Sequence, residues 1–286
     1  MISAIVTAYQ RIEQTLETLR VIQSCTPPPD EILVHVDANE IDCEKAIQRA
    51  FPMVRVLRSD GKVGPGGGRN KLVEAARFEF IASFDDDSYP IDSDYFDRVV
   101  KLFQQFPDAS VICAAVCHVG ESIALDTRSA QWTADFLGAA CSYRRQAFID
   151  AGGYVPLPVA YGMEEVDLAL RLHSRGGKIL NTPWLRVFHN NDLRHHAEPE
   201  ITAGSIANLA LLAYLRYPVS LWAIGAGQCA NRLLWLLRHG RYRGILKGVG
   251  MIPAHLRAHH RYRLPLSKRA VRSYLALRRA PVSQNL

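Results

Sequence analysis

Residues 81–90, IASFDDDSYP, decide the fold prediction for this chain. The first four residues are largely apolar and predict a short buried strand. The next three residues are all aspartates, Asp85, Asp86 and Asp87. Adjacent carboxylates repel one another, so a cation or a hydrogen-bonding ligand is needed to hold all three ionised. A solvated turn before Pro90 is the alternative, because Asp and Ser often build turns.

Apolar runs and helical patterns alternate over the residues that precede this stretch. The patterns predict strands at residues 2–9, 31–36, 54–57 and 81–84, and helices at residues 11–25, 41–51 and 70–80. Such alternation predicts an α/β fold with a mixed, mostly parallel sheet and helices on both faces. Ligands bind beyond the carboxyl ends of the strands in these sheets. The aspartate triplet, and Asp37 after the second strand, are therefore expected at the ligand-binding edge.

A glycine-rich segment precedes the third predicted helix. Residues 61–70, GKVGPGGGRN, would let backbone amides at a helix N-terminus approach an anion. The spacing matches neither the P-loop nor the dinucleotide-binding fingerprint. A flexible surface loop is the alternative interpretation.

Two later segments carry candidate functional side chains. Residues 162–172 predict a helix with Glu164 and Glu165 in its first turn, where acids also occur simply because they suit the helix dipole. His189 follows a predicted strand at residues 185–188, a position at which a lone His is more often structural than a ligand.

The chemistry of the triplet favours a divalent metal site. Asp is a hard oxygen ligand suited to Mg²⁺ or Mn²⁺, and Mg²⁺ binds through one or two carboxylates together with substrate phosphates. A phosphatase with an aspartyl nucleophile would also use such a site. Its motif requires Thr or Val where Tyr89 stands, and it normally follows the first strand, so we discount it.

An ordered set of motifs in this chain resembles the inverting family 2 glycosyltransferases of GT-A fold, especially bacterial enzymes that build cell-surface polysaccharides. The resemblance covers roughly residues 1–192. The matching segments are Val6-Thr7-Ala8-Tyr9, Val36-Asp37, Arg69-Asn70, the DxD motif Asp85-Asp86-Asp87, and residues 164–168, EEVDL, where the family has ED-x-DL. Residues 136–140 and 152–154 also resemble its acceptor-side segments.

The resemblance implies a nucleotide-binding role for several of these residues. Thr7, Ala8 and Tyr9 would line the base and ribose. Asp37 would accept a hydrogen bond from the imide of a pyrimidine, and Arg69 would lie near the nucleotide.

The resemblance also implies which residues bind the sugar and the metal, and which residue accepts the proton of the acceptor hydroxyl. Asp85 and Asp86 would belong to the nucleotide-sugar site, with Asp85 facing the ribose or the sugar. Asp87, completed by His189, would bind the Mn²⁺ or Mg²⁺ that bridges the diphosphate. The family's base maps to Glu165, where Glu replaces the usual Asp, and the adjacent Glu164 leaves the choice open.

The implied activity is metal-dependent, inverting transfer of a sugar from a nucleoside diphosphate, UDP or dTDP, to a hydroxyl of a glycan or lipid-linked acceptor. A divalent cation stabilises the leaving diphosphate, and one carboxylate acts as general base, worth on the order of 10²–10⁴-fold. The alternative is a non-catalytic protein of the same fold that binds sugar nucleotides or polysaccharide. The Glu at position 165 is the one feature that favours it.

Charge is unevenly distributed along the chain. Residues 1–200 hold 20 Lys and Arg with all 28 Asp and Glu, whereas residues 201–286 hold 14 Lys and Arg and no acid. The basic residues there alternate with Leu, Ile, Trp and Tyr, and no apolar run reaches the ~20 residues of a spanning helix. Basic amphipathic helices of this kind predict peripheral contact with an anionic membrane. Packing on the body or on a second subunit is the alternative, and the absence of a known RNA or DNA motif disfavours nucleic acid.

The composition, 48% apolar and 22% charged, is typical of a globular protein. We expect a GT-A catalytic domain at residues 1–192, with a nucleotide-binding half at 1–90 and an acceptor-side half at 91–192, and a basic helical extension at 193–286. The six cysteines lack metal-binding spacing, and the N-terminus is more typical of a strand than of a signal peptide. These features predict a cytoplasmic location, peripheral at the inner face of the cell membrane; a homo-oligomer is compatible with them.

Overall fold

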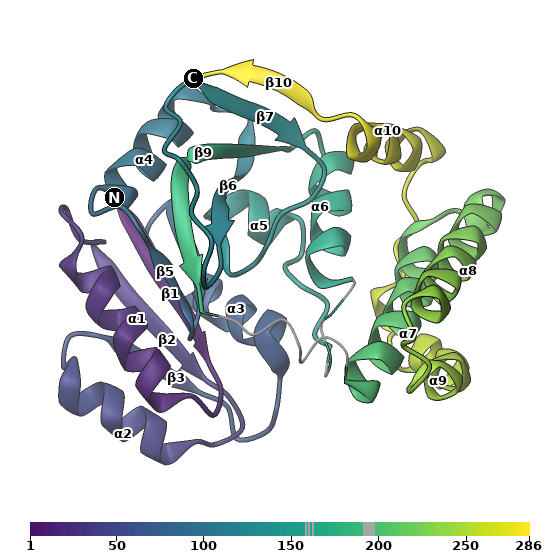
Figure 1. The fold of residues 1–286 in the computed structure, drawn as a ribbon, viewed down its shortest axis with the longest axis horizontal. Helices are drawn as coiled ribbons and strands as arrows, with labels where there is room; N and C mark the ends of the chain where they lie inside the picture. Colours follow the sequence, from purple (N-terminus) through teal and green to yellow (C-terminus); the bar gives the residue numbers. More distant parts are fainter. Residues whose placement is uncertain (158, 160, 162, 191–197) are drawn as a thin grey trace.

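A computed structural model describes residues 1–157, 159, 161, 163–190 and 198–286 (Figure 1). In this part of the chain ten strands form one sheet, in the order β10-β7-β9-β6-β8-β4-β1-β2-β3, with β5 added beside β9. Helices cover both faces of the sheet, as the sequence predicts.

The N-terminal half of the sheet is parallel. It consists of β1 (Ile2–Ala8), β2 (Glu31–Val36), β3 (Arg55–Arg58) and β4 (Phe80–Asp85). The connecting helices are α1 (Ile12–Ser24), α2 (Ile41–Ala50) and α3 (Gly64–Ala75). The predicted strands and the first two predicted helices are confirmed to within two residues.

The third helix begins earlier than the sequence predicts. We expected residues 70–80, but α3 spans Gly64–Ala75, so the glycine-rich segment forms its first turns and is largely buried rather than a surface loop. Pro65 suits the first turn because its fixed φ is helical. The Asp37 carboxylate accepts hydrogen bonds at 2.9 Å from the amides of Val63 and Gly64, which have no intrahelical partner.

The second half of the sheet is mixed. Its strands are β5 (Ser88–Pro90), β6 (Ala109–Cys117), β7 (Ser129–Thr133), β8 (Ala140–Arg144), β9 (Lys178–His189) and β10 (Val282–Asn285). β8 lies antiparallel between β4 and β6, and β6 and β9 are parallel. Antiparallel pairs need no helical crossover, and no helix separates β6, β7 and β8. A larger part of the sheet is therefore antiparallel than the strand–helix alternation of the first 84 residues predicts.

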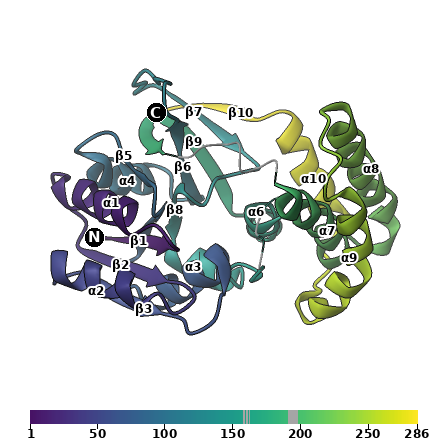
Figure 2. The same ribbon diagram turned by 60° about the horizontal axis from the view of Figure 1, so that its bottom comes forward.

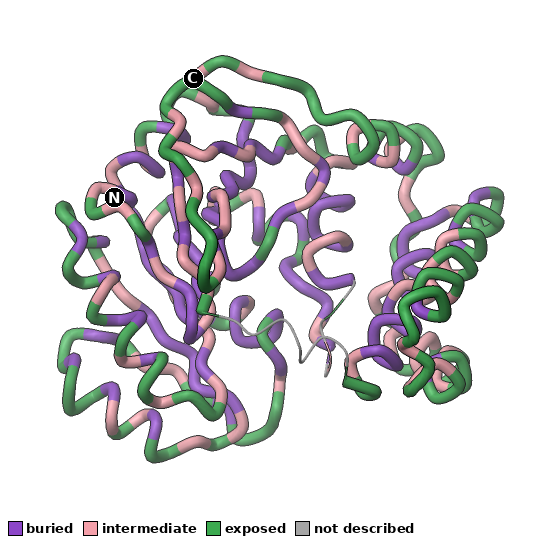
Figure 3. Tube along the Cα trace, in the orientation of Figure 1, coloured by how far each residue is buried: buried purple, intermediate pink, exposed green. Residues whose placement is uncertain are grey.

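Two apolar layers enclose the sheet. One contains the inner sides of α1, α2 and α4 (Tyr95–Gln105). The other contains α3, α5 (Arg145–Asp150) and α6 (Glu164–Ser174). Alternate residues of β1 point to opposite layers, with Val6 in the first and Ile5 in the second. Figure 3 shows this buried centre.

The region after residue 198 is helical, as predicted. It contains α7 (Pro199–Arg216), η2 (Val219–Leu221), α8 (Trp222–Arg238), α9 (Ile245–Ala258), η3 (His260–Tyr262) and α10 (Lys268–Arg279). α8 and α9 both pack on α7, to one side of the sheet (Figure 2). α10 packs on α6, and β10 pairs with β7, so the end of the chain returns to the body. Across the described residues, no helix combines the length and apolarity needed to cross a bilayer.

Candidate active site

The site lies where β1, β2 and β4 end side by side. Thr7 on β1 is in register with Asp85 on β4, and its hydroxyl donates to Asp85 Oδ1 at 3.2 Å. Ala8 ends β1 and is buried. The expectation that the acids lie at the carboxyl edge of the sheet is thus met by the fold.

The middle aspartate of the triplet is buried and forms its contacts within the protein. Asp86 is 6% exposed and accepts a hydrogen bond from the Tyr9 amide at 3.0 Å. Burial raises the pKa of Asp86 to about 7, and the negative charge of Asp87 acts in the same direction. Asp86 therefore anchors the residue after β1 to the acidic turn.

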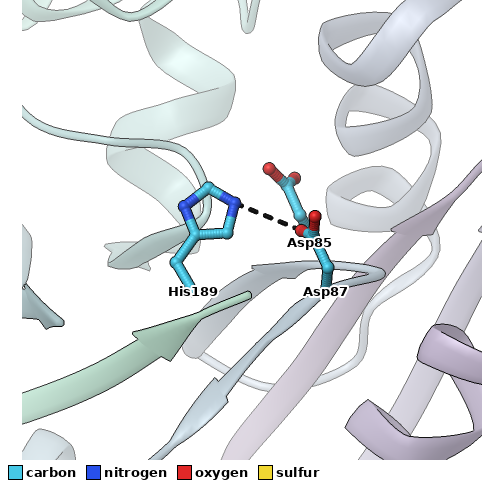
Figure 4. A group of neighbouring side chains, drawn as sticks. All are labelled: Asp85, Asp87 and His189. Atoms are coloured by element: carbon cyan, nitrogen blue, oxygen red, sulfur yellow. Dashed lines mark ion pairs between the residues drawn. The ribbon is translucent and has the colours of Figure 1, made fainter. Parts of the chain in front are cut away.

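Asp85, Asp87 and His189 converge at this edge (Figure 4). One potential ligand atom from each lies within 4.8 Å of the other two. His189 reaches the cluster because β5 pairs with the end of β9, opposite Ser88. Its Nε2 atom is 3.1 Å from Asp87 Oδ1.

The interaction between Asp87 and His189 shifts the pKa of both side chains. Burial alone would raise the pKa of Asp87, but the hydrogen bond and charge of His189, with the charge of Arg11, outweigh burial and lower it. Burial would likewise lower the pKa of His189, but Asp87 and Asp85 raise it above its ordinary value.

The donor set of this cluster fits a divalent metal. Two carboxylates and one imidazole are ligands that Mn²⁺ or Mg²⁺ accepts, with carboxylates dominant for Mg²⁺. Among the described residues, this is the group of His, Cys, Asp and Glu side chains close enough to hold a metal ion. The proposed metal ligands Asp87 and His189 thus lie together, with Asp85 as a third.

Arg69 is a buried residue that contacts both the aspartate triplet and α6. It is 2% exposed, donates to Ser83 Oγ at 3.0 Å, and pairs with the carboxylate of Asp85. Its Nη1 atom also lies 3.4 Å from Glu164 Oε1. A Cβ atom on Gly138 would stand 2.9 Å from the Arg69 guanidinium carbon, so only glycine allows this approach. Arg69 therefore joins the aspartate triplet to the helix that carries the two glutamates.

The two glutamates occupy different environments. Glu164 is 1% exposed and lies against α3, where a Cβ atom on Gly66 would come within 2.7 Å of its carboxyl carbon. Its Oε2 atom has no hydrogen-bond partner among the described residues. Burial, reinforced by the charge of Glu165, raises the pKa of Glu164 to about 8.

Glu165 is only partly buried and faces the segment before β8. Its Oε1 atom accepts a hydrogen bond from the Gly138 amide at 3.3 Å. Burial raises the pKa of Glu165, against the lowering effect of Arg69. Of the two acids, Glu165 is the less buried residue.

The residues expected to contact a nucleotide base lie beyond Asp85 on the β2 side. Asp37 is 5% exposed and both of its carboxylate oxygens accept amide hydrogen bonds at the start of α3. The Lys62 ammonium lies 4.5 Å from the centre of the Tyr9 ring. Asp37 therefore holds the first turn of α3 in place next to Tyr9.

Arg11 is a residue of this site that sequence reasoning missed. Its guanidinium pairs with Asp87 and lies 3.4 Å from Asp86 Oδ1. Its position immediately before α1, two residues after Tyr9, was the available signal, but Arg before a helix is too common to single out. The close approaches at Gly66 and Gly138 were missed too, because each depends on a side chain far away in the sequence.

The fold and the site place this protein among α/β proteins with the GT-A-like fold of glycosyltransferase structures. Residues 3–152 match the family Glycosyl transferase family 2, so the chain belongs to that family. No curated protein matches the chain.

Three solved structures show the same fold. GalNAc-T7 with UDP, GalNAc and Mn²⁺ is 12% identical, with a TM-score of 0.61 over 77% of this chain and 48% of that one. The mannosyltransferase PcManGT from Pyrobaculum calidifontis, with GDP-Man and Mn²⁺, is 15% identical, with a TM-score of 0.59 over 96% of this chain and 78% of that one. S. aureus TarS is 13% identical, with a TM-score of 0.50 over 74% and 42%. This chain thus spans about half the length of GalNAc-T7 and less than half of TarS.

Proposed function

We propose that this protein is a metal-dependent inverting glycosyltransferase that uses a nucleoside-diphosphate sugar. The observation that carries the proposal is the convergence of Asp85, Asp87 and His189 at one sheet edge, which Arg69 links to Glu164 of α6. Family membership supports it, as do the ligands of two similar structures, UDP, GalNAc and Mn²⁺ in one and GDP-Man and Mn²⁺ in the other.

The donor would lie across the carboxyl ends of β1, β2 and β4. Thr7, Ala8, Tyr9 and Asp37 border the part of this edge where base and ribose would bind. Asp85, Asp87 and His189 would hold Mn²⁺ or Mg²⁺, which neutralises the charge of the leaving diphosphate. We propose UDP or dTDP as the nucleotide; the similar structures contain UDP in one case and GDP-mannose in another.

We propose Glu165 as the general base. Glu165 is less buried than Glu164, and the raised pKa of Glu165 makes it a better proton acceptor than an ordinary carboxylate. The acceptor oxygen forms a bond to the anomeric carbon, the bond from that carbon to the diphosphate breaks, and the acceptor proton passes to Glu165. A single displacement inverts the configuration. Glu164 is buried against Arg69 and α3 and would position the first turn of α6 instead.

Paired glutamine variants test these roles. Glu165→Gln should bind the donor normally in calorimetry but lose turnover by on the order of 10²–10⁴-fold, because the amide cannot accept the proton. Glu164→Gln should retain most of its turnover, since Gln keeps the shape of a side chain that touches no acceptor. Wild-type-like turnover in Glu165→Gln, or a reversed pattern, would remove the assignment.

The acceptor and the location are also proposals. The acid-free helical region supports an enzyme that works in the cytoplasm at the inner face of the cell membrane on a glycan or lipid-linked acceptor, in cell-surface polysaccharide synthesis. Transfer to lipid-linked but not to water-soluble acceptors would support this, and the reverse preference would contradict it.

A non-catalytic sugar-nucleotide or polysaccharide-binding protein is the second candidate, favoured by Glu rather than Asp at position 165. It predicts donor binding without hydrolysis or transfer across a broad acceptor panel with Mn²⁺ present. Any Glu165-dependent turnover would exclude it.

A further inference from the structure

Helix α8 is apolar and yet largely exposed. Its 17 residues include two charged side chains, Arg232 and Arg238. Gly225 and Leu236 are its buried residues, whereas Trp222, Ile224, Leu234, Trp235 and Leu237 are all exposed. A helix that is apolar on every side is normally buried in a protein core or in lipid. Figure 3 shows the exposed outer side of α8.

Among the described residues, α8 packs mainly on α7. It approaches α7 so closely that a Cβ atom on Gly225 would lie 2.4 Å from Ala213 Cβ. Tyr217 of the α7 C-terminus donates to Gln228 at 3.1 Å. These contacts fix which side of α8 faces inward. Ile224, Leu234 and Leu237 on its outer part remain exposed. Trp222 is also exposed, although one side of its ring lies against Arg263.

α9, the other helix that packs on α7, also exposes apolar side chains. It packs on α7 through Gly248, where a Cβ atom would stand 2.8 Å from the Ala203 carbonyl oxygen. Its outer side exposes Leu246 by 89% and Val249 by 43%. Tyr242, in the turn between α8 and α9, is 66% exposed.

The same region concentrates positive charge. The guanidinium carbons of Arg232 and Arg241 lie 4.8 and 5.3 Å from the centre of the Trp235 ring, and His239 stacks on that ring at 4.2 Å. Within the described part of the chain, ion pairs engage three of the 14 cations of residues 201–286, namely Arg216, Lys247 and Arg278. No ion pair among the described residues engages the other 11 cations, and two of these, Arg232 and Arg241, flank the exposed Trp235.

We propose that the outer sides of α8 and α9 form a docking surface for an anionic lipid bilayer. We call it the α8–α9 surface, defined by Trp222, Leu234, Trp235, Leu237, Leu246 and Val249. The leucine and valine side chains would enter the acyl boundary, the tryptophans would lie at headgroup depth, and Arg232 and Arg241 would pair with lipid phosphates. This contact rests on the surface alone and is independent of the proposed sugar transfer.

Charge and polarity favour lipid over the other occupants. A second copy meeting this surface through a two-fold axis would bring together two acid-free regions of like charge. A nucleic acid would match the charge, but its binding sites rely on backbone cations and stacking aromatics rather than on exposed Leu and Val. A bilayer with anionic headgroups matches both the apolar and the basic components.

Vesicle co-sedimentation of the full chain provides the test. We expect binding to vesicles of phosphatidylcholine with phosphatidylglycerol, with at least tenfold weaker binding to phosphatidylcholine alone and a blue shift of tryptophan emission on binding. Leu246→Glu should weaken binding at least tenfold. It should not disrupt folding, because an acid suits the first turn of α9.

The chain offers a matched control. Met53 on the catalytic body is also 89% exposed, so Met53→Glu adds the same charge at a site of equal exposure outside the surface. Met53→Glu should bind vesicles as the wild type does, and Arg232→Gln/Arg241→Gln should lose the preference for anionic lipid while still folding, as circular dichroism would report.

Three results would overturn the proposal. The first is no binding to anionic vesicles, or equal weakening by Leu246→Glu and Met53→Glu. The second is a dimer in light scattering that Leu246→Glu dissociates, which would assign the surface to a second copy. The third is salt-sensitive RNA or DNA binding that anionic vesicles do not displace.

Discussion

Three consecutive aspartates in this protein have three different partners. Asp85 pairs with Arg69, Asp86 is buried beneath the Tyr9 amide, and Asp87 pairs with His189 and Arg11. β4 ends at Asp85, so the following residues leave the sheet and diverge. Each carboxylate thus has a compensating partner, and Arg11 contacts both Asp86 and Asp87. Repulsion remains, because the charges of Asp87 and Asp85 still raise the pKa of Asp86.

The pKa of His189 predicts how metal affinity varies with pH. An imidazole binds a metal only when neutral, and the pKa of His189 lies above its ordinary 6.5. The stabilisation of metal-free protein by the Asp87–His189 pair is full below pH 6.5 and is lost as the pH rises through the folded-state pKa. Stabilisation by Mn²⁺ should change in the opposite sense. The increase in Tm with Mn²⁺ should therefore grow between about pH 6 and pH 8.

Two variants separate this effect from general metal binding. In His189→Asn the dependence of the Mn²⁺-induced Tm shift on pH should flatten, because the titrating ligand is gone. In Asp87→Ala the shift itself should be largely lost. A pH-dependent shift of normal size in Asp87→Ala would place the metal elsewhere.

At the scale of elements, α6 is held by a buried ionic network next to its two glutamates. Asp167 is fully buried and accepts hydrogen bonds from Arg171, four residues on, and from Arg216 of α7. Arg171 also donates to the carbonyls of Ala151 and Gly153. The helical region is thus tied to the helix that carries the proposed base.

Breaking this network should be far more costly than breaking an exposed ion pair. Arg216→Met should lower the free energy of unfolding by about 3–5 kcal/mol, because Asp167 loses a buried partner. Arg278→Met is the matched control. Its partner is Asp135, with side chains 45% and 38% exposed, so the loss should be at most about 1 kcal/mol. Urea denaturation measures both, and equal losses would contradict the account.

At the scale of the whole molecule, the C-terminal residues form the strand at one edge of the sheet. β10 pairs antiparallel with β7, and Leu286 donates its amide to the Arg128 carbonyl. Tyr274 of α10 donates to Asp135 at 2.7 Å. The basic region is therefore bound to the body both through α7 and through the C-terminus.

Removing residues 282–286 should cause self-association rather than unfolding. β10 is the edge strand of the sheet and is mostly exposed, so the core loses mainly the contact of Leu286. Its removal moves the open edge to β7, where Trp132 loses its cross-strand partner Val282 and another chain can extend the sheet. Static light scattering should show concentration-dependent growth at an unchanged circular dichroism spectrum. A variant that keeps the strand but substitutes its exposed Val282 with Thr should stay as monodisperse as the wild type; growth in that variant, or none in the truncation, would contradict the prediction.

Local patterns carried most of the successful prediction. Strand and helix positions in the first half, and the acids at the ends of β2 and β4, follow from apolar periodicity, which each segment holds within itself. Contacts across long sequence separations were not predictable in this way. The Arg69–Glu164 pair spans 95 residues, and Arg11–Asp87 spans 76.

The sequence by itself determined the α/β alternation, the acidic turn after β4 and the acid-free region from residue 201 onward, because neighbouring residues encode these features. Tertiary structure alone decided that Glu164 is more deeply buried than Glu165, that the glycine run is helical, and that α8 exposes apolar side chains. The reason is physical: periodicity is a property of one segment, whereas burial and ion pairing depend on which distant elements pack against it.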